Sequence, residues 1–236
     1  MPKRFIFRMT YGANIQRYLQ DGEIRSKNHH NIQHGYRTSF SDIVQRRGGT
    51  SFTTPCTRNV NDFVPFYFSP ATAMAYTINQ GNVPLVDPTN QNVGFASSED
   101  IVYIVADPIK VAAACPFWFT DIACNSVAQT PNYSNIIQNI EPHIKWSLFD
   151  DTPRMGIISE IGYRGVCRWF HDNHSNINWI NRTKIRMAEF LVQDVFPVDL
   201  IECFVIKSTK WEHWLQQQIQ SVGKNIPVYV KSGCFF

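Results

Sequence analysis

Short runs of apolar, β-branched and aromatic residues recur along this 236-residue chain and constrain its fold more than any other feature. Runs of this length and composition predict β-strands. They are F-I-F-R-M-T-Y at 5–11, F-V-P-F-Y-F at 63–68, I-V-Y-I-V-A at 101–106, M-A-E-F-L-V at 187–192, L-I-E-C-F-V-I at 200–206 and I-P-V-Y-V at 226–230. Their spread over the whole chain predicts one sheet assembled from distant segments.

Helix signals lie between these runs without a regular alternation. N-cap residues and helix-ending glycines mark the expected helices. We expect one from Asn14 to Gly22, one between Ser69 and Gly81, one beginning at Asp121 and one after Thr209. Parallel βαβ folds alternate strand and helix regularly, so this pattern predicts an α+β fold. The length fits a single domain over residues 1–236.

Nothing in the composition predicts a membrane or secreted protein. The chain has no run of about 18 apolar residues, and its basic start lacks both a long apolar stretch and a small-residue cleavage site. The six cysteines are scattered without a C-x-x-C pair, which favours a reduced protein. We therefore expect a cytoplasmic location. The net charge of +3 does not by itself indicate nucleic-acid binding.

Most of the familiar signatures of chemistry are missing. The chain contains no G-x-x-x-x-G-K-[ST], no G-x-G-x-x-G and no G-x-S-x-G. Cys167, His171 and His174 form C-x-x-x-H-x-x-H, and His30 and His34 lie four apart, but this ligand set is incomplete for zinc. We predict no metal site, with polar loop histidines as the simpler interpretation.

Two polar segments are long enough to serve function. Residues 26–62 contain Arg46 and Arg47 directly before Gly48 and Gly49, and two guanidinium groups can hold diphosphate oxygens bidentately. A solvated basic turn is the alternative. Residues 150–183 mix charges, glycines and aromatic residues without a period, which predicts a long loop.

Glu189 is an unexpected residue in its context. In a strand with period 2 it shares a face with Ile185, Met187 and Leu191. An ionised carboxylate on an apolar face is costly unless it is paired, protonated or facing a cleft. Glu189 is therefore an active-site acid, an edge-strand glutamate in a salt bridge or, if the segment is helical, a surface glutamate.

In register, these segments resemble the DarT family of ADP-ribosyltransferase toxins, which modify bases of single-stranded DNA using NAD. F-R-M-T at 7–10 stands where the family has Y-H-I-T, and D-I-V-Q-R-R at 42–47 is similar to its arginine motif. V-P-F-Y-F-S-P-A-T-A-M-A-Y at 64–76 and M-A-E-F-L-V at 187–192 match V-P-F-Y-F-x-P-x-S-P-M-L-Y and A-E-F-L-V. F-W-F-T-D at 117–121 and P-V-Y-V-K at 227–231 match more weakly.

The resemblance implies the ADP-ribosyltransferase fold, a split mixed or antiparallel sheet with flanking helices, a long substrate loop and NAD in the cleft between the halves. It implies that Glu189 and Arg47 are the catalytic pair. A carboxylate below the ribose stabilises the positive charge that develops when nicotinamide leaves, and it can take a proton from the attacking base. NAD is consumed as the ADP-ribose donor.

The resemblance also implies which residues hold NAD and what is modified. The expected cofactor-binding residues are Arg8, Thr10, Asn14, Arg46, Met74 and Tyr76, with core packing as the alternative for Met74 and Tyr76. Met187 stands where arginine-modifying enzymes of this fold place a second acid or glutamine, which argues against a protein arginine as the acceptor. Arg8 and Ala123 replace family histidines, and the second replacement leaves guanine, another base or RNA open beside thymine.

The 150–183 loop carries cations between aromatic residues, an arrangement that suits single-stranded nucleic acid. We expect Arg154, Arg164, Arg168 and Trp169 to bind it, with Arg182, Tyr163, Phe170 and Trp179 interleaved. A loop folded over its own aromatic core is the alternative. The first hypothesis is a monomeric ADP-ribosyltransferase that modifies single-stranded DNA and has a cognate antitoxin, in a toxin–antitoxin or phage-defence pair. The second is the same transfer to RNA. The third is a catalytically silent nucleic-acid-binding module.

Overall fold

The computed structural model describes residues 2–40, 45, 47–49, 53–126 and 129–236, whose strands and helices form an α+β fold. The strands are β1 (Ile6–Tyr11), β2 (Glu23–Arg25), β3 (Phe63–Tyr67), β4 (Pro84–Val86), β5 (Asn92–Phe95), β6 (Ile101–Ala106), β7 (Phe117–Thr120), β8 (Tyr133–Ser134), β9 (Arg154–Met155), β10 (Val166–Cys167), β11 (Glu189–Gln193), β12 (Val195–Pro197), β13 (Ile201–Ile206) and β14 (Val228–Val230). The helices are α1 (Asn14–Asp21), α3 (Ala73–Asn79), α4 (Pro108–Ala114), α5 (Ile140–His143), α6 (Arg182–Ile185) and α7 (Glu212–Ser221).

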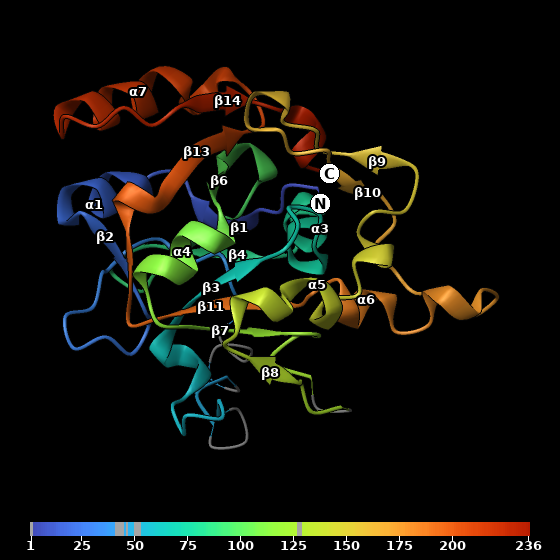
Figure 1. The fold of residues 1–236 in the computed structure, drawn as a ribbon. Coiled ribbons are helices and arrows are strands. Elements are labelled where there is room, and N and C mark those ends of the chain that lie inside the picture. Colours follow the sequence, from blue (N-terminus) through green and yellow to red (C-terminus); the bar gives the residue numbers. More distant parts are fainter. Residues whose placement is uncertain (1, 41–44, 46, 50–52, 127–128) are drawn as a thin grey trace.

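The main sheet has the order β14-β13-β6-β1-β3-β11-β7-β8 within the described residues. Its neighbours are antiparallel except for the parallel pair β13–β14. In Figure 1, α7 lies beside β14 at one end of the sheet, and β7 and β8 lie at the other. No helix in the described part of the chain is long and apolar enough to cross a membrane.

The sheet is split between β1 and β3. These two strands pair at a single position, Phe7 opposite Tyr67, whereas β1 pairs with β6 along its whole length. The halves are therefore β14-β13-β6-β1 and β3-β11-β7-β8, joined at a narrow seam. This confirms the expected split mixed sheet and leaves room for a cavity where the two halves diverge.

Strand β11 has two different faces because its side chains alternate. Phe190 and Val192 belong to the main core, while Leu191 packs in a smaller cluster with Val60, Phe63 and Cys124. Glu189, at the first position of β11, shares the Leu191 face. The alternation places the carboxylate on the side of the sheet away from the main core.

The residues before Glu189 correct one prediction. The strand begins at Glu189, whereas Arg182–Ile185 forms α6, with hydrogen bonds from the N–H groups of Ile185 and Arg186 to the carbonyls of Asn181 and Arg182. The period-2 argument therefore holds for Glu189 and Leu191 but not for the residues before them. Arg182 and Arg186 are both buried, and the helical turn between them brings two side chains four positions apart into the same interior.

The first helix begins at Asn14 as predicted, but Ala13 occupies its N-cap position and the Asn14 side chain bonds to Thr10 and Tyr36 instead of capping the helix. Two other predicted helix starts are wrong. Thr72, not Ser69, caps α3. No helix begins at Asp121, whose carboxylate accepts bonds from Asn132.

Other predicted elements are confirmed. Strand β6 matches its predicted range, and β13 and β14 fall within theirs. The first helix ends at Gly22, which has a left-handed φ of 73°. The helix expected after Thr209 is α7, preceded by one short turn. Residues 150–183 hold only two-residue strands, short 3-10 turns and the start of α6, and they extend to one side of the sheet in Figure 1.

Candidate active site

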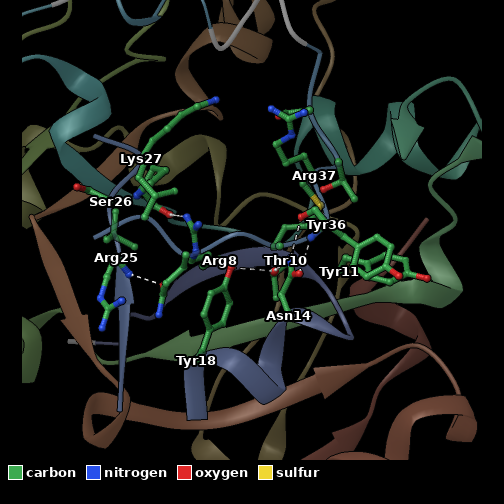
Figure 2. Close-up of a pocket in the computed structure, with 18 of the residues that line it drawn as sticks. Arg8, Thr10, Tyr11, Asn14, Tyr18, Arg25, Ser26, Lys27, Tyr36 and Arg37 are labelled. Carbon is green, nitrogen blue, oxygen red and sulfur yellow. Dashed lines mark hydrogen bonds between the residues drawn. The ribbon is translucent and has the colours of Figure 1, made fainter. Parts of the chain in front are cut away.

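A cavity of about 510 Å³ opens beside the seam of the sheet. Its walls come from β1, α1, β3 and the polar segment at residues 25–39 (Figure 2). Pockets of roughly 300–1,000 Å³ hold small molecules and cofactors. The volume and the position at the divergence of two half-sheets mark this cavity as the candidate substrate site.

Polar side chains from β1 and α1 are fixed along one wall of the cavity. The Asn14 side-chain amide donates to Thr10 Oγ1 at 3.2 Å and to the carbonyl of Tyr36 at 2.8 Å, and its oxygen accepts from the Tyr36 N–H. The Tyr11 and Tyr36 rings lie 4.6 Å apart beside this network. Asn14 thus ties the polar segment to β1, so the wall is built before any ligand arrives.

Arg8 crosses the seam. Its Nη1 donates to the carbonyl of Pro65 on β3 at 3.1 Å, while its buried Nε has no hydrogen-bond partner within the described residues. A guanidinium from β1 therefore supplements the one strand pair that joins the half-sheets. Arg8 also lines the cavity.

Glu189 lies behind this cavity and is held from three directions. Its backbone N–H donates to Thr120 Oγ1 at 3.0 Å, and its Oε1 accepts from the Cys124 N–H at 3.1 Å. Arg47 makes a bidentate ion pair with both carboxylate oxygens, at 2.9 and 2.8 Å. Glu189 is only 1% exposed, whereas Arg47 lines the cavity. The acid is therefore covered by the arginine in this state.

The charges around Glu189 perturb their neighbours. Burial disfavours the charged form of Arg47, but the facing carboxylate outweighs burial and raises the pKa of the guanidinium. Tyr67 is the cross-strand partner of Glu189, and burial followed by the negative charge of Glu189 raises the pKa of its phenol. The same two causes raise the pKa of the Cys124 thiol. Tyr67 and Cys124 therefore stay neutral beside the ion pair near pH 7.

The cavity wall is strongly cationic. Arg8, Arg25, Lys27, Arg37 and Arg47 all line it, and Lys27 and Arg37 lie on opposite sides of the opening in Figure 2. Burial, followed by the charges of Arg37 and Arg47, lowers the pKa of Lys27. Cations brought together in this way repel one another until an anion binds among them. The wall suits a phosphorylated ligand.

The structure brings together most of the predicted catalytic and cofactor-binding residues. Arg8, Thr10, Asn14, Arg47 and Met74 line one cavity. Tyr76 does not: it is 44% exposed, and its ring packs against Phe170 and Phe236. Arg46 lies outside the described residues. Sequence reasoning missed Lys27, Arg37, Tyr36 and Tyr67 as lining residues; Tyr67 could have been found from the register of V-P-F-Y-F opposite Glu189.

No group of three or more His, Cys, Asp or Glu residues that could hold a metal exists among the described residues. Cys167 is buried and accepts a bond from Arg182. The Cys167 sulfur is thus already engaged as a hydrogen-bond acceptor.

A family model described as "ssDNA thymidine ADP-ribosyltransferase, DarT" matches residues 7–236. The chain belongs to the DarT family. It is 25% identical over 229 residues to a DNA ADP-ribosyl transferase from Thermus aquaticus, covering 94% of this chain and 82% of that protein.

Two solved DarT proteins have the same fold. Thermus sp. 2.9 DarT in complex with ADP-ribosylated ssDNA superposes on this chain with a TM-score of 0.77 at 18% identity, and the match covers 99% of this chain and 97% of that one. The complex of the same protein with NAD+ superposes with a TM-score of 0.68. Thermosipho africanus DarTG in complex with ADP-ribose gives 0.64 at 16% identity, over 99% of this chain and 51% of that one. These matches confirm the ADP-ribosyltransferase fold.

Most of the remaining predicted residues lie on the 150–183 loop. Arg164 and Arg168 are exposed, and Trp169 is 37% exposed. Arg154 is exposed but bonds to the carbonyl and carboxylate of Asp150. Arg182, by contrast, is fully buried, so it cannot contact a ligand as the interleaved pattern suggested. The loop therefore offers Arg164 and Arg168 as its main candidates for phosphate binding.

Position 123, where Ala123 replaces the family histidine, lies in the protein interior. Ala123 is buried, and its N–H donates to the carbonyl of Lys184 in α6. The next residue, Cys124, contacts Glu189 through its N–H. The methyl group of Ala123 offers no proton acceptor to a base.

Proposed function

We propose that this DarT-family chain transfers ADP-ribose from NAD to a nucleobase of single-stranded DNA, with Glu189 and Arg47 as its catalytic residues. The observation that carries the proposal is the bidentate Arg47–Glu189 pair, set directly behind a cationic cavity of about 510 Å³. A structural ion pair would need no such cavity. The family match over residues 7–236 supports the same reaction.

Different residues of the cavity would hold different parts of NAD. Lys27 and Arg37 at the opening, with Arg47 deeper, suit the two phosphate groups. Thr10 and Arg8 offer hydrogen-bonding groups on the β1 wall, Asn14 holds that wall in place, and Met74 adds an apolar surface. The residues present therefore fit a dinucleotide, and the NAD-bound Thermus relative supports this use of the fold.

Arg47 connects binding to chemistry. It now covers both oxygens of Glu189, so the carboxylate cannot yet face a ribose. A phosphate offers the guanidinium a competing bidentate partner. Binding of NAD would draw Arg47 toward the phosphates and release at least one carboxylate oxygen toward the ribose.

The bond that breaks joins nicotinamide to the anomeric carbon, and nicotinamide leaves neutral with the bonding electron pair. Glu189 then faces the positive charge on the ribose, which preorganised negative charge stabilises most effectively in a site shielded from water. The acceptor base forms the new bond to that carbon, and Glu189 accepts the proton that the base gives up. One carboxylate serves both steps.

The acceptor side rests on the 150–183 loop. Arg164 and Arg168 would track the phosphates, and Trp169 would stack on a base. The family description names thymidine, but Ala123 provides no side-chain acceptor for the base. Thymine is the first candidate, with guanine or another base next and RNA as the alternative strand.

The biological setting follows the family. We propose a cytoplasmic, monomeric toxin held in check by a cognate antitoxin, in a toxin–antitoxin or phage-defence pair. The structural similarity to Thermosipho africanus DarTG, in which this chain matches about half of the length, supports a two-part system.

The test incubates the protein with NAD and short strands of defined sequence, as matched DNA and RNA. We expect a mass increase of one ADP-ribose on a DNA strand and none on its RNA counterpart, because the 2′-hydroxyl distinguishes the two. Modification of RNA alone would move the substrate assignment to RNA. No modification of any strand would leave only the silent binding module.

A further inference from the structure

Two arginines just before Glu189 are the largest fully buried polar side chains in the described part of the chain. Arg182 and Arg186, in and after α6, are both 0% exposed. Burying a guanidinium is costly unless its donors are satisfied. The hydrogen-bond partners of Arg182 and Arg186 therefore show which segments of the chain these buried guanidinium groups hold together.

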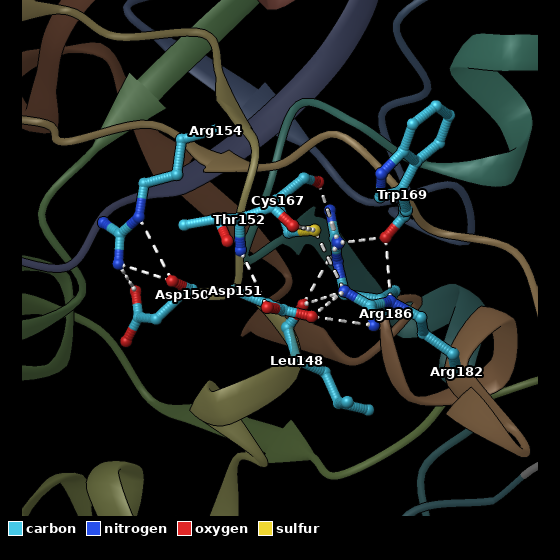
Figure 3. A network of polar contacts seen from close by, with 9 residues as sticks. All are labelled: Leu148, Asp150, Asp151, Thr152, Arg154, Cys167, Trp169, Arg182 and Arg186. Atoms are coloured by element: carbon cyan, nitrogen blue, oxygen red, sulfur yellow. Dashed lines mark hydrogen bonds and ion pairs between the residues drawn. The ribbon is translucent and has the colours of Figure 1, made fainter. Parts of the chain in front are cut away.

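Arg186 donates hydrogen bonds to three distant segments, of which Figure 3 shows the Leu148 and the Cys167–Trp169 segments. Its Nη1 donates to the carbonyls of Cys167 and Trp169 at 3.0 and 3.1 Å, and to that of Leu148 at 3.3 Å. Its Nη2 donates to Ser69 Oγ and the Ala71 carbonyl at 3.2 and 3.3 Å. It pairs with no carboxylate in the described residues, and burial lowers its pKa to about 10, so it remains charged near neutral pH.

Arg182 repeats the pattern on the same loop. Its Nε donates to the Trp169 carbonyl at 2.8 Å, and its Nη2 to the Leu148 carbonyl and Cys167 Sγ at 3.1 and 3.0 Å. Asp151 accepts from both terminal nitrogens at 3.2 Å. The two guanidinium groups thus share Leu148, Cys167 and Trp169.

Arg186 joins segments that must be aligned with one another if a bound single strand is to reach Glu189. Residues 167 and 169 flank the exposed Arg168 on the 150–183 loop, and residues 69–71 connect β3 to α3. Arg186 itself lies three positions before Glu189. One side chain therefore connects the proposed strand-binding loop, the end of β3 and the start of β11.

We propose that Arg186, supported by Arg182, is a positioning residue that fixes the Cys167–Trp169 part of the loop relative to Glu189, so that a bound single strand presents its base to the carboxylate. The inference rests on the proposed function for its catalytic consequence. The clamp formed by Arg182 and Arg186 is itself a property of the loop. Lysine cannot replace this arrangement, because one ammonium group cannot span five acceptors on three segments.

The test compares Arg186→Lys and Arg182→Lys with Arg58→Lys. Arg58 pairs with Asp62 and Asp194, away from the 150–183 loop, so it is a matched control. Trypsin can cut after the exposed Arg164 and Arg168. We expect both clamp variants to be cut there about tenfold faster than wild type, the factor expected from losing one charge-assisted hydrogen bond to the loop.

Kinetics then separate positioning from general damage. We expect Arg186→Lys to raise the KM for the oligonucleotide about tenfold, while the KM for NAD and the melting-temperature increase caused by NAD stay close to wild type. Equal losses for both substrates would overturn the positioning role. If Arg186→Lys does not fold, Ser69→Ala, which removes one Arg186 acceptor, is measured in the same way and must raise only the oligonucleotide KM.

The two proposals fail differently. If wild type transfers nothing to any strand, the proposed function fails, but protease sensitivity and oligonucleotide affinity still test the clamp. If transfer occurs and the clamp variants match wild type in cleavage rate and oligonucleotide KM, the clamp alone is refuted.

Discussion

Replacing Arg47 by alanine isolates the ion pair on which the site depends. The change leaves a carboxylate that is 1% exposed and that still accepts from the Cys124 N–H. Removing one partner of a buried pair costs about 3–5 kcal/mol. Arg47 is 13% exposed and borders the cavity, so water can reach Glu189 after truncation. We therefore expect the lower end, a decrease of about 3 kcal/mol in the free energy of unfolding.

Urea unfolding followed by tryptophan fluorescence measures this decrease through the midpoint at constant slope. Arg58→Ala is the matched control, since its pair with Asp194 is 37% exposed on the arginine side and should cost less than about 1 kcal/mol. Adding Glu189→Gln to Arg47→Ala should recover about 2 kcal/mol, because the stranded charge is gone. Arg47→Ala within about 0.5 kcal/mol of wild type would refute the claim that the pair is buried and coupled.

Two further predictions concern the substrates. Lys27→Met should raise the KM for NAD, whereas Lys110→Met, on the surface beside Glu202, should not. Because the pKa of Lys27 is lowered by burial and by Arg37 and Arg47, Lys27 loses its charge at a lower pH than a lysine in solvent. Affinity for NAD should therefore weaken as the pH rises through that pKa. Lys27→Met should lack this pH-dependent loss of affinity. An unchanged pH profile in the variant would contradict this. Arg164→Gln combined with Arg168→Gln should weaken oligonucleotide binding and reduce the salt slope by about 0.7 for each phosphate that is no longer neutralised, with NAD binding intact; a slope equal to wild type would contradict the loop assignment.

Sequence patterns predict the parts of the fold that depend on local periodicity. Strand β6 and the end of α1 at Gly22 follow from apolar runs and a left-handed glycine. The predicted N-cap roles fail at Asn14, Ser69 and Asp121 because a polar side chain that can cap a helix can also bond to a distant segment. Single-sequence propensity does not contain those tertiary partners.

The candidate active site also combines features that the sequence predicts with features that it does not. The misfit of Glu189 on an apolar strand face singles it out, and the family motif singles out Arg47, but neither predicts their direct pairing over 142 positions in sequence. Lys27 and Arg37 escape prediction because they lie in a polar segment without a period, and only the folded wall brings them to the opening. Charge alone assigns Arg182 to the nucleic-acid surface, and its burial reverses that role.

The central claim is that Glu189 is the acid of an NAD-dependent transfer to a single strand. The most direct measurement is the mass gain of DNA strands incubated with NAD and either wild type, Glu189→Gln or the control Glu202→Gln, whose carboxylate pairs with Lys110 on the surface. We predict one ADP-ribose added by wild type and by the control, and a rate about a thousandfold lower for Glu189→Gln. Transfer by Glu189→Gln at the wild-type rate would contradict the account.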